Sequence, residues 1–491
     1  MKRPTVTVMA VRVQIVEVDG DGAESGSGAG ADVAVEPLGV TDEAQNDGEE
    51  LTERLTARDA LADLLAVLRL CAVGKLRCSE KTSRPSAATV TAVAEVLRHG
   101  DFYVDDPIAA FAWPLLLQAG GLAEIVGGRL TLTAKGRAAL TKPPAETIRL
   151  LWKRWLSHAL LDEMSRIEEI KGQRSARALT AAGPRRKAVG EALAMHCALS
   201  EWMPVDLLFG SMITEGPQFG VARDLWKLYL DDREYGSLGY DGHHGWTLLE
   251  GRYTLCLLFE YAGTLGLFDL RYGSAAGARD DFRDNWGADW IDCLSRYDGL
   301  AEIRLNRLGA YVLGLSDRYE PDAAAGEDDD RQGEDDDADD ILEPIKVLPS
   351  LDVVVTGRLV PSEELLLDAF ARRRSERVWA LSLASLLVAI EQGRQPEELR
   401  AFLTSRAAVD ELPAAVRTLF VDATGRSGQL RDLGYSKVVE CADPALAALI
   451  GNDRKLRAVC QRIGDRHLAV SPEREADFRA AVRKLGYALP L

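Results

Sequence analysis

The spacing of apolar residues predicts a run of amphipathic helices at the start of the folded chain. In "LTARDALADLLAVLRL" and "AATVTAVAEVLRHG" the apolar residues recur at i, i+3 and i+4, which is the period of one helix face. "DPIAAFAWPLLLQAGG" predicts a third helix, with Asp105 or Asp106 as its N-cap. The folded part of the chain is therefore expected to open with three helices.

The pattern then changes to alternation. "LAEIVGGRLTLT" alternates apolar and polar residues around the two-residue turn Gly127-Gly128, which predicts a β-hairpin. Three helices closed by a hairpin form the arrangement of a winged helix. We expect a winged helix over residues 51–142.

The same order of elements recurs further along the chain. "TLLEGRYTLCLLFEYAGTLG" predicts a helix that ends on glycine, "LFDLRY" predicts a strand, and "GLAEIRLN" predicts its return strand. Residues 273–299 lie between the two strands and would form a long insertion in the wing. We expect this second winged helix over residues 191–319.

One motif closes both predicted hairpins. "RLTLTAKGRAAL" and "RLNRLGAYVL" both read Leu-[Thr/Asn]-x-x-Gly-x-x-x-Leu. We expect the Thr or Asn to cap the turn and the glycine to let the next helix begin close to the strands. An internal duplication explains the pair. Between the two copies, residues 143–190 predict a long bridging helix, "AETIRLLWKRWLSHALLDEMSRIEEI", followed by a basic loop.

Acidic residues are concentrated in two stretches. The net charge of the 491 residues is −18; residues 1–50 hold 11 acidic and 3 basic side chains, and residues 327–340 hold 10 and 1, which leaves −1 for the rest. We expect a strand-like start and a flexible acidic region within residues 1–50, and an acidic linker over residues 320–342. Because the remainder is nearly neutral, the overall acidity does not exclude a nucleic-acid partner.

Residues 343–491 predict a small mixed α/β domain with short elements. Its strands are predicted at "IKVLPSLDVVVTG", "SKVVECA" and "HLAV". Its helices are predicted at "SEELLLDAFARRR", "SLASLLVAIEQG", "QPEELRAFLTSRA", "LPAAVRTLFVDATG", "DPALAALIGND" and "SPEREADFRAAVRKLG". The predicted fold class is α+β and mostly helical, with tandem winged helices followed by this mixed domain.

One stretch of this domain resembles a known family. "EELRAFLTSRAAVDELPAAVRTLFVDATGRSGQLRDLGYSKVVECADPALAALIGND" resembles the N-terminal, non-motor domain of XPB-type helicases, which bacterial helicase-associated proteins also carry. The resemblance covers about residues 345–490 and lies in the order of helices, turn and strand. It implies a domain that contacts DNA and docks partner subunits without hydrolysing ATP. The layout of the chain is also similar to the non-catalytic TFIIH subunit that binds XPB.

Motifs for catalysis are absent from the sequence. No G-x-x-x-x-G-K-[ST] phosphate loop occurs, and Gly74-Lys75 is followed by Leu76. "DEAQ" at residues 42–45 falls in the predicted flexible region, and no G-x-S-x-G nucleophile elbow is present. We therefore predict a protein that is not an enzyme and needs no cofactor.

Metal and membrane contacts are not predicted. His243 and His244 in "DGHHGW" are the candidates for a metal site, but no Cys/His ligand spacing accompanies them and a surface turn explains them as well. The seven cysteines include no C-x-x-C pair, and no apolar stretch is long enough to span a membrane. These features predict a cytoplasmic protein.

DNA contact is predicted through phosphates rather than bases. "DPIAAFAWPLLLQAGG" has no basic residue and "TLLEGRYTLCLLFEYAG" has only Arg252, so neither is equipped to read base edges. Phosphate contact needs only positive charge on one face, although a solvated surface also explains such stretches. The candidates for DNA-backbone contact are Arg174, Arg177, Arg185, Arg186, Lys187, Arg372, Arg373, Arg374, Arg377, Arg454, Lys455, Arg457, Arg462 and Arg466.

These features favour a non-catalytic, DNA-associated protein that partners or regulates a helicase or translocase. A winged-helix transcription regulator is an alternative, which a footprint at a defined DNA sequence would favour. A metal-dependent nuclease around "DGHHGW" is a further alternative, which a divalent-metal titration would test. The acidic run 327–340 is interpreted as a solvated linker, with mimicry of nucleic acid as the other interpretation.

Overall fold

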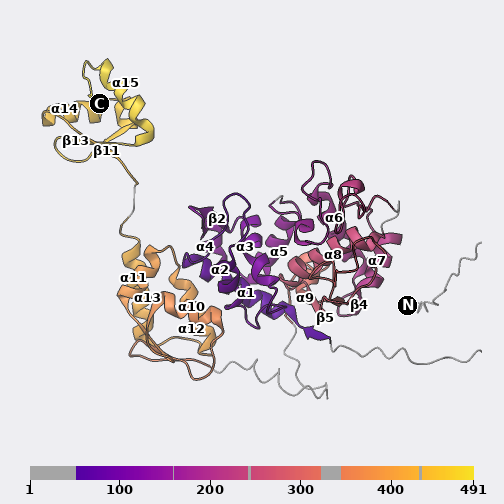
Figure 1. The fold of residues 1–491 in the computed structure, drawn as a ribbon. Coiled ribbons are helices and arrows are strands. Elements are labelled where there is room, and N and C mark those ends of the chain that lie inside the picture. Colours follow the sequence, from indigo (N-terminus) through magenta and orange to yellow (C-terminus); the bar gives the residue numbers. More distant parts are fainter. Residues whose placement is uncertain (1–50, 159, 241–244, 322–343, 431–433, 491) are drawn as a thin grey trace, which may run out of the picture. The chain divides into compact units, whose positions relative to one another are not determined.

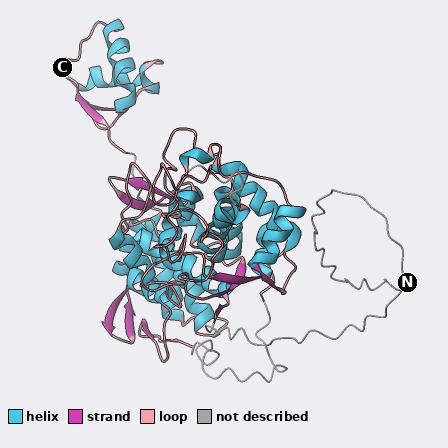
Figure 2. Cartoon of the chain, turned by 45° about the vertical axis from the view of Figure 1, so that its right-hand side comes forward, coloured by secondary structure: helices cyan, strands magenta, loops and turns pink. Residues whose placement is uncertain are grey.

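The computed structural model describes residues 51–158, 160–240, 245–321, 344–430 and 434–490. Helices predominate and the sheets are small (Figure 1, Figure 2), which confirms the predicted α+β, mostly helical fold class. Three sequence predictions lie outside the described residues: the region 1–50 with its "DEAQ", the acidic run 327–340, and the pair His243 and His244.

The first module, residues 56–139, consists of three helices followed by a hairpin. Its elements are α1 (Thr56–Ala72), α2 (Ala87–Ala94), α3 (Ala109–Ala119), β2 (Ala123–Val126), β3 (Arg129–Leu132) and α4 (Ala134–Ala139). The predicted helices and hairpin are thereby confirmed. An isolated bridge between Arg77 and Arg129 places a third extended segment beside β3.

The predicted N-cap of α3 is wrong. The carboxylate of Asp101, and not that of Asp105 or Asp106, accepts hydrogen bonds at 2.7 to 3.0 Å from the backbone N–H groups of residues 108–110. Asp106 is instead paired with Arg296. The capping group reaches the helix across a loop, which local sequence rules do not reveal.

The second module, residues 182–313, repeats this order of helices and strands. Its elements are α6 (Ala182–His196), β4 (Trp202–Pro204), α7 (Val205–Thr214), a helix with three consecutive stretches η3 (Thr247–Gly251), α8 (Arg252–Cys256) and η4 (Leu257–Gly263), then β5 (Phe268–Tyr272), β6 (Leu300–Leu305) and α9 (Arg307–Leu313). The stretches η3 and η4 are π-helical. β4 pairs with β6 in the second module, and in the first module the extended segment at Arg77 pairs with β3 in the same way.

The turn after each hairpin has the same construction in both modules. The side chain of Thr133 accepts a hydrogen bond from the N–H of Gly136 at 3.1 Å, and that of Asn306 accepts one from Gly309 at 2.9 Å. A Cβ on either glycine would lie 2.0 Å from a backbone carbonyl oxygen at the start of its own hairpin. The predicted roles of cap and close-approach glycine are confirmed.

The two modules form one body because the chain before α1 joins the sheet of the second module. β1 (Thr52–Arg54) pairs with β5, and the sheet order is β1-β5-β6-β4. At the start of α1, the hydroxyl of Thr56 donates to the carbonyl of Phe268 at 2.6 Å. A single apolar cluster then runs through both modules.

The predicted long bridging helix is wrong. Among the described residues of this stretch, the α-helix α5 (Pro144–Trp155) ends at Trp155, where the chain turns away, and only the short 3-10 helix at Glu163–Arg166 follows. The guanidinium of Arg186 donates to the backbone carbonyls of Trp155, His158 and Leu161, which satisfies the acceptors that a longer helix would have used internally.

Residues 344–430 form a four-stranded sheet with helices around a separate apolar cluster. The elements are β7 (Lys346–Val347), β8 (Asp352–Val354), α10 (Pro361–Phe370), β9 (Ala371–Ser375), β10 (Val378–Leu381), α11 (Leu383–Glu391), α12 (Pro396–Arg406) and α13 (Ala414–Ser427). The sheet order is β7-β8-β10-β9. The predicted first strand is therefore two strands, and the arginines expected at the end of a helix lie on β9.

Residues 434–490 have an apolar cluster of their own. The elements are β11 (Lys437–Glu440), α14 (Pro444–Asn452), η6 (Leu456–Ala458), β12 (Cys460–Arg462), β13 (His467–Val470), η7 (Pro472–Arg474) and α15 (Glu475–Lys484). β13 is the central strand of the order β11-β13-β12. The predicted strands at residues 437–440 and 467–470 are confirmed, whereas β12 was not predicted.

Candidate nucleic-acid interface

Two of the fourteen candidate cations are buried and cannot reach a phosphate. Arg185 and Arg186 lie on α6 rather than in a loop, and their exposed fractions are 1% and 0%. The guanidinium of Arg185 is paired with Asp162 and lies over the ring of Tyr253. The prediction of DNA contact by these two arginines is therefore wrong.

Arg186 is the centre of a buried polar network. Its Nε donates to Glu163, at the start of η1 (Glu163–Arg166), over 2.5 Å. Glu163 also accepts from Trp155 Nε1 at 3.0 Å and from the Tyr253 hydroxyl at 3.1 Å. Burial raises the pKa of Glu163. Burial alone would lower the pKa of Arg186, but the ion pair with Glu163 outweighs burial and raises the pKa of Arg186. The network fixes the turn after α5 against α6 and α8.

Arg252, the one basic residue of the second candidate recognition helix, is also buried. Its Nε donates to Asp298 at 3.1 Å, and its Nη atoms donate to Asp281 at 2.6 Å. Its exposed fraction is 0%. Because both carboxylates belong to the wing insertion, Arg252 holds that insertion in place and is not directed toward solvent.

The remaining candidates are exposed, but they differ in their partners. On the edge strand β9, Arg373 is paired with Glu364. Arg374 of the same strand is paired with Asp352 at a distance of 3.2 Å. Arg377 donates to a backbone carbonyl. Arg372, like Arg174, Arg177 and Lys187 of the body, is exposed and makes no ion pair with any residue that the structure describes.

The turn between α14 and β12 presents three neighbouring cations. Arg454, Lys455 and Arg457 are exposed, and none forms an ion pair within the described ranges. The carboxylate of Asp453 accepts from the N–H groups of Lys455 and Leu456 at 2.8 and 3.0 Å, and these hydrogen bonds lower its pKa. The ordered turn therefore holds the three cations, which we call the cationic turn, on the outside.

The charge around the cationic turn is favourable to an anion. Residues 434–490 hold 10 Arg and Lys side chains against 7 Asp and Glu. Arg462 and Arg466 lie nearby in sequence on β12 and in the loop after it, although Arg462 is paired with Asp465 at 3.8 Å and Arg466 with Glu440 at 3.2 Å. This stretch keeps three cations without a carboxylate partner among the described residues, as the stretch at residues 174–187 does, but here the three lie within four consecutive positions.

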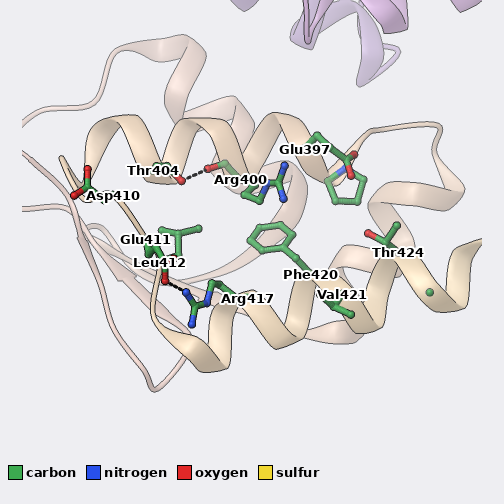
Figure 3. Close-up of a pocket in the computed structure, with 12 residues that line it drawn as sticks. Glu397, Arg400, Thr404, Asp410, Glu411, Leu412, Arg417, Phe420, Val421 and Thr424 are labelled. Carbon is green, nitrogen blue, oxygen red and sulfur yellow. Dashed lines mark hydrogen bonds and ion pairs between the residues drawn. The ribbon is translucent and has the colours of Figure 1, made fainter.

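A groove of about 700 Å³ lies between α12 and α13 (Figure 3). Leu412 and Phe420 line it and are nearly buried, whereas Val421 is 70% exposed. Its charged lining residues are of both signs: Glu397, Arg400, Asp410, Glu411 and Arg417. A surface of mixed charge around an apolar centre suits a polypeptide better than a nucleic acid. Sequence reasoning missed the groove, because it depends on how two helices pack.

The described part of the chain shows neither a metal cluster nor a membrane-spanning helix. It contains no group of three or more His, Cys, Asp or Glu side chains that could hold a metal ion. Among the same residues, no helix is long and apolar enough to cross a membrane. Burial raises the pKa of the thiols of Cys71 and Cys78, to about 12 and about 11, so these cysteines stay protonated at neutral pH.

Comparison with known proteins identifies one segment. Residues 346–463 match a protein family described as the helicase conserved C-terminal domain. No curated protein matches the chain. The matched segment contains the β9 arginines, the groove and the cationic turn. It supports the prediction of a helicase-associated protein, while the finer resemblance to XPB-type helicases remains a prediction.

Proposed function

We propose that the protein is a non-catalytic subunit that binds a helicase or translocase and contacts DNA through phosphates. The observation that carries the proposal is the match of residues 346–463 to a helicase-related domain. The resemblance of about residues 345–490 to the non-motor domain of XPB-type helicases supports it further. In this proposal the groove between α12 and α13 receives the motor partner.

Phosphate contact is assigned to the cationic turn. A DNA backbone requires exposed positive charge along a face, and Arg454, Lys455 and Arg457 supply it without a competing ion pair among the described residues. Contacts of this kind carry no base information, so binding would be independent of DNA sequence.

The two modules of the body would act as winged-helix scaffold. The shared order of helices, the strand pairing of Arg77 with β3 and of β4 with β6, and the identical turns at Thr133 and Asn306 support this assignment. In both, the helix before the hairpin offers no exposed basic side chain to a groove, since α3 has none and Arg252 is buried. This counts against a transcription regulator that reads bases.

The non-catalytic role rests on the sequence. The sequence has no G-x-x-x-x-G-K-[ST] loop, whose amides and lysine would hold the phosphates of ATP. The purified protein should therefore show no ATP hydrolysis, with or without duplex DNA. Hydrolysis that persists after removal of contaminating ATPases would overturn this part of the proposal.

The partnership is tested by recovering tagged protein from its own cells and identifying bound proteins by mass spectrometry. Val421→Asp places a charge in the groove at a position 70% exposed, and Val388→Asp is the matched control, 51% exposed on α11 outside the groove. We expect a helicase or translocase with the unmodified chain and with V388D, but not with V421D. Absence of any such motor, together with no salt-sensitive binding of duplex DNA, would reject the function.

A further inference from the structure

A second surface, unconnected with the cationic turn, lies on the long loops of the second module. Five aromatic side chains there are largely exposed: Trp226 (58%), Tyr235 (61%), Tyr240 (58%), Trp286 (52%) and Trp290 (91%). Large aromatic side chains are normally at least half buried in a folded protein, so this concentration marks a surface that interacts. We call it the aromatic face.

Four of the five rings of the aromatic face lie in two pairs that are linked to each other, and Trp290 follows Trp286 by four residues. The rings of Tyr235 and Trp286 are 5.7 Å apart, and those of Trp226 and Tyr240 are 5.2 Å apart. The Tyr240 hydroxyl donates to the carbonyl of Glu234, the residue beside Tyr235, at 2.6 Å, which links the two pairs.

The face is also held by packing beneath it. Leu228, Leu230 and Leu238 of the same loops are buried in the body core. A Cβ on Gly236 would lie 3.2 Å from the Trp286 ring, so the loop and the wing insertion lie in close contact. The exposed rings therefore lie on loops that pack against the body core.

Negative charge predominates around four of these rings. Residues 231–240 and 283–292 hold six acidic side chains against Arg233 and Arg283, a balance of −4, whereas residues 221–230 around Trp226 hold Arg223 and Lys227 against Asp224. All six are exposed: Asp231, Asp232, Glu234, Asp284, Asp289 and Asp292. Within the described ranges these six carboxylates form one ion pair, between Asp231 and Lys171 at 4.0 Å, where attraction is weak.

Aromatic rings with carboxylates between them select for cations. A guanidinium or ammonium group is attracted to the face of Trp or Tyr and, at the same time, to a neighbouring carboxylate. A nucleic acid could stack its bases on these rings, but six carboxylates would repel its phosphates. We propose that the aromatic face docks an arginine- or lysine-rich segment of a partner protein.

This inference goes beyond the proposed function, because it uses neither the groove nor the helicase-related segment. The partner with the basic segment need not be a motor protein. Failure of the aromatic face to bind cations would leave the motor partnership and the DNA contact of the cationic turn untouched.

The test uses the full chain and a fluorescently labelled peptide of alternating arginine and glycine as the probe, followed by anisotropy. We expect saturable binding that weakens as salt is raised. Trp290→Ala should weaken binding about fivefold, equivalent to ~1 kcal/mol, whereas Trp290→Phe should retain most of it. Replacing Asp284 and Asp289 with Asn should reduce both the affinity and its dependence on salt.

Tyr435→Ala is the matched control, since Tyr435 is 95% exposed and lies outside the face; it should bind the probe as the unmodified chain does. Equal binding by W290A and Y435A would overturn the proposal. Preference for a single-stranded oligonucleotide over the peptide would also overturn it, because this outcome assigns the face to nucleic acid. A dimer in sedimentation that the W290A variant dissociates would do the same, because it assigns the face to a second copy of the chain.

Discussion

Thr133 and Asn306 hold the same place in the two modules and make the same hydrogen bond, each accepting from the N–H of the glycine three residues later. The two turns differ in the cap and in most neighbouring residues, yet both keep the glycine. Its conservation within the chain has a steric reason: at each turn the first residue of the hairpin directs its carbonyl oxygen at the position where a Cβ would be.

Gly136→Ala and Gly309→Ala should therefore both destabilise the body. The new Cβ would lie 2.0 Å from the carbonyl oxygen of Leu122 or Leu267, and the backbone would have to move apart. We expect a loss of about 3 kcal/mol from each change, at the upper end of overpacking. Calorimetry of the full chain would measure it as an earlier unfolding transition of the body.

Gly210→Ala is the control for these two variants. Gly210 lies inside α7, and a Cβ there meets no atom within 4 Å. The change should leave stability unaltered or raise it by about 0.5 to 1 kcal/mol through helix propensity. If all three variants behaved alike, the steric explanation of the duplicated glycine would be wrong.

Arg186→Met should destabilise the body by about 3 to 5 kcal/mol, because it leaves Glu163 ionised or protonated without its main partner inside the core. Lys187→Met, on the exposed neighbour, should change stability by less than about 0.5 kcal/mol. Pairing Arg186→Met with Glu163→Leu should recover part of the loss. Equal unfolding midpoints for R186M and K187M would contradict the structural role.

The sequence predicted helices wherever the apolar period and a local stop agreed. Helices α1, α12 and α13 begin and end within a few residues of the predicted positions, because proline or a change of pattern bounds them locally. The helix α5 failed this rule. Its apolar spacing continues past Trp155, but a guanidinium about thirty residues later in the chain ends the helix, and no local pattern reports that contact.

The candidate site was predictable in composition but not in exposure. Arg185, Arg186 and Lys187 are consecutive and carry the same charge, yet two are in the core and one is in solvent. The position of each residue on helix α6 decides its exposure, and the sequence alone did not indicate that α6 begins at Ala182. Similarly, the arginines of β9 favour a helix by propensity, and pairing with the apolar strand "VWAL" of β10 overrides it. Val378 and Trp379, a β-branched and an aromatic residue, were the signal available in the sequence.

Asp63 should make stability depend on pH. Burial, together with the neighbouring Asp59, raises its pKa from 3.8 to about 8, although the N–H of Arg98 donates to it at 2.7 Å and opposes the rise. The folded chain therefore holds a proton on Asp63 that the unfolded chain releases above about pH 4. The contribution of this group is complete below that pH and is lost as the pH rises toward 8, with a slope of at most ~1.4 kcal/mol per pH unit.

Asp63→Asn isolates this effect, because an amide keeps an acceptor for the Arg98 N–H without a titrating proton. We expect the variant to gain stability relative to the unmodified chain as the pH rises from 5 to 8, measured by denaturant unfolding at each pH. Titrating groups remote from Asp63 contribute equally to both chains and cancel in the difference. A difference in unfolding free energy that is constant over this range would show that Asp63 does not hold the proton.

The cationic turn makes a quantitative prediction for DNA. Each phosphate contact contributes about 0.9 to the slope of log K against log salt, so replacing Arg454, Lys455 and Arg457 with Ala should reduce the slope for duplex DNA by about 2.7. The loss should be the same for duplexes of unrelated sequence, because phosphates carry no base information. Replacing the exposed Lys135, Lys142 and Lys153 of the body with Ala removes the same charge and should leave the slope unchanged. If both triple variants reduced the slope equally, general charge would explain binding and the assignment to residues 454–457 would fail.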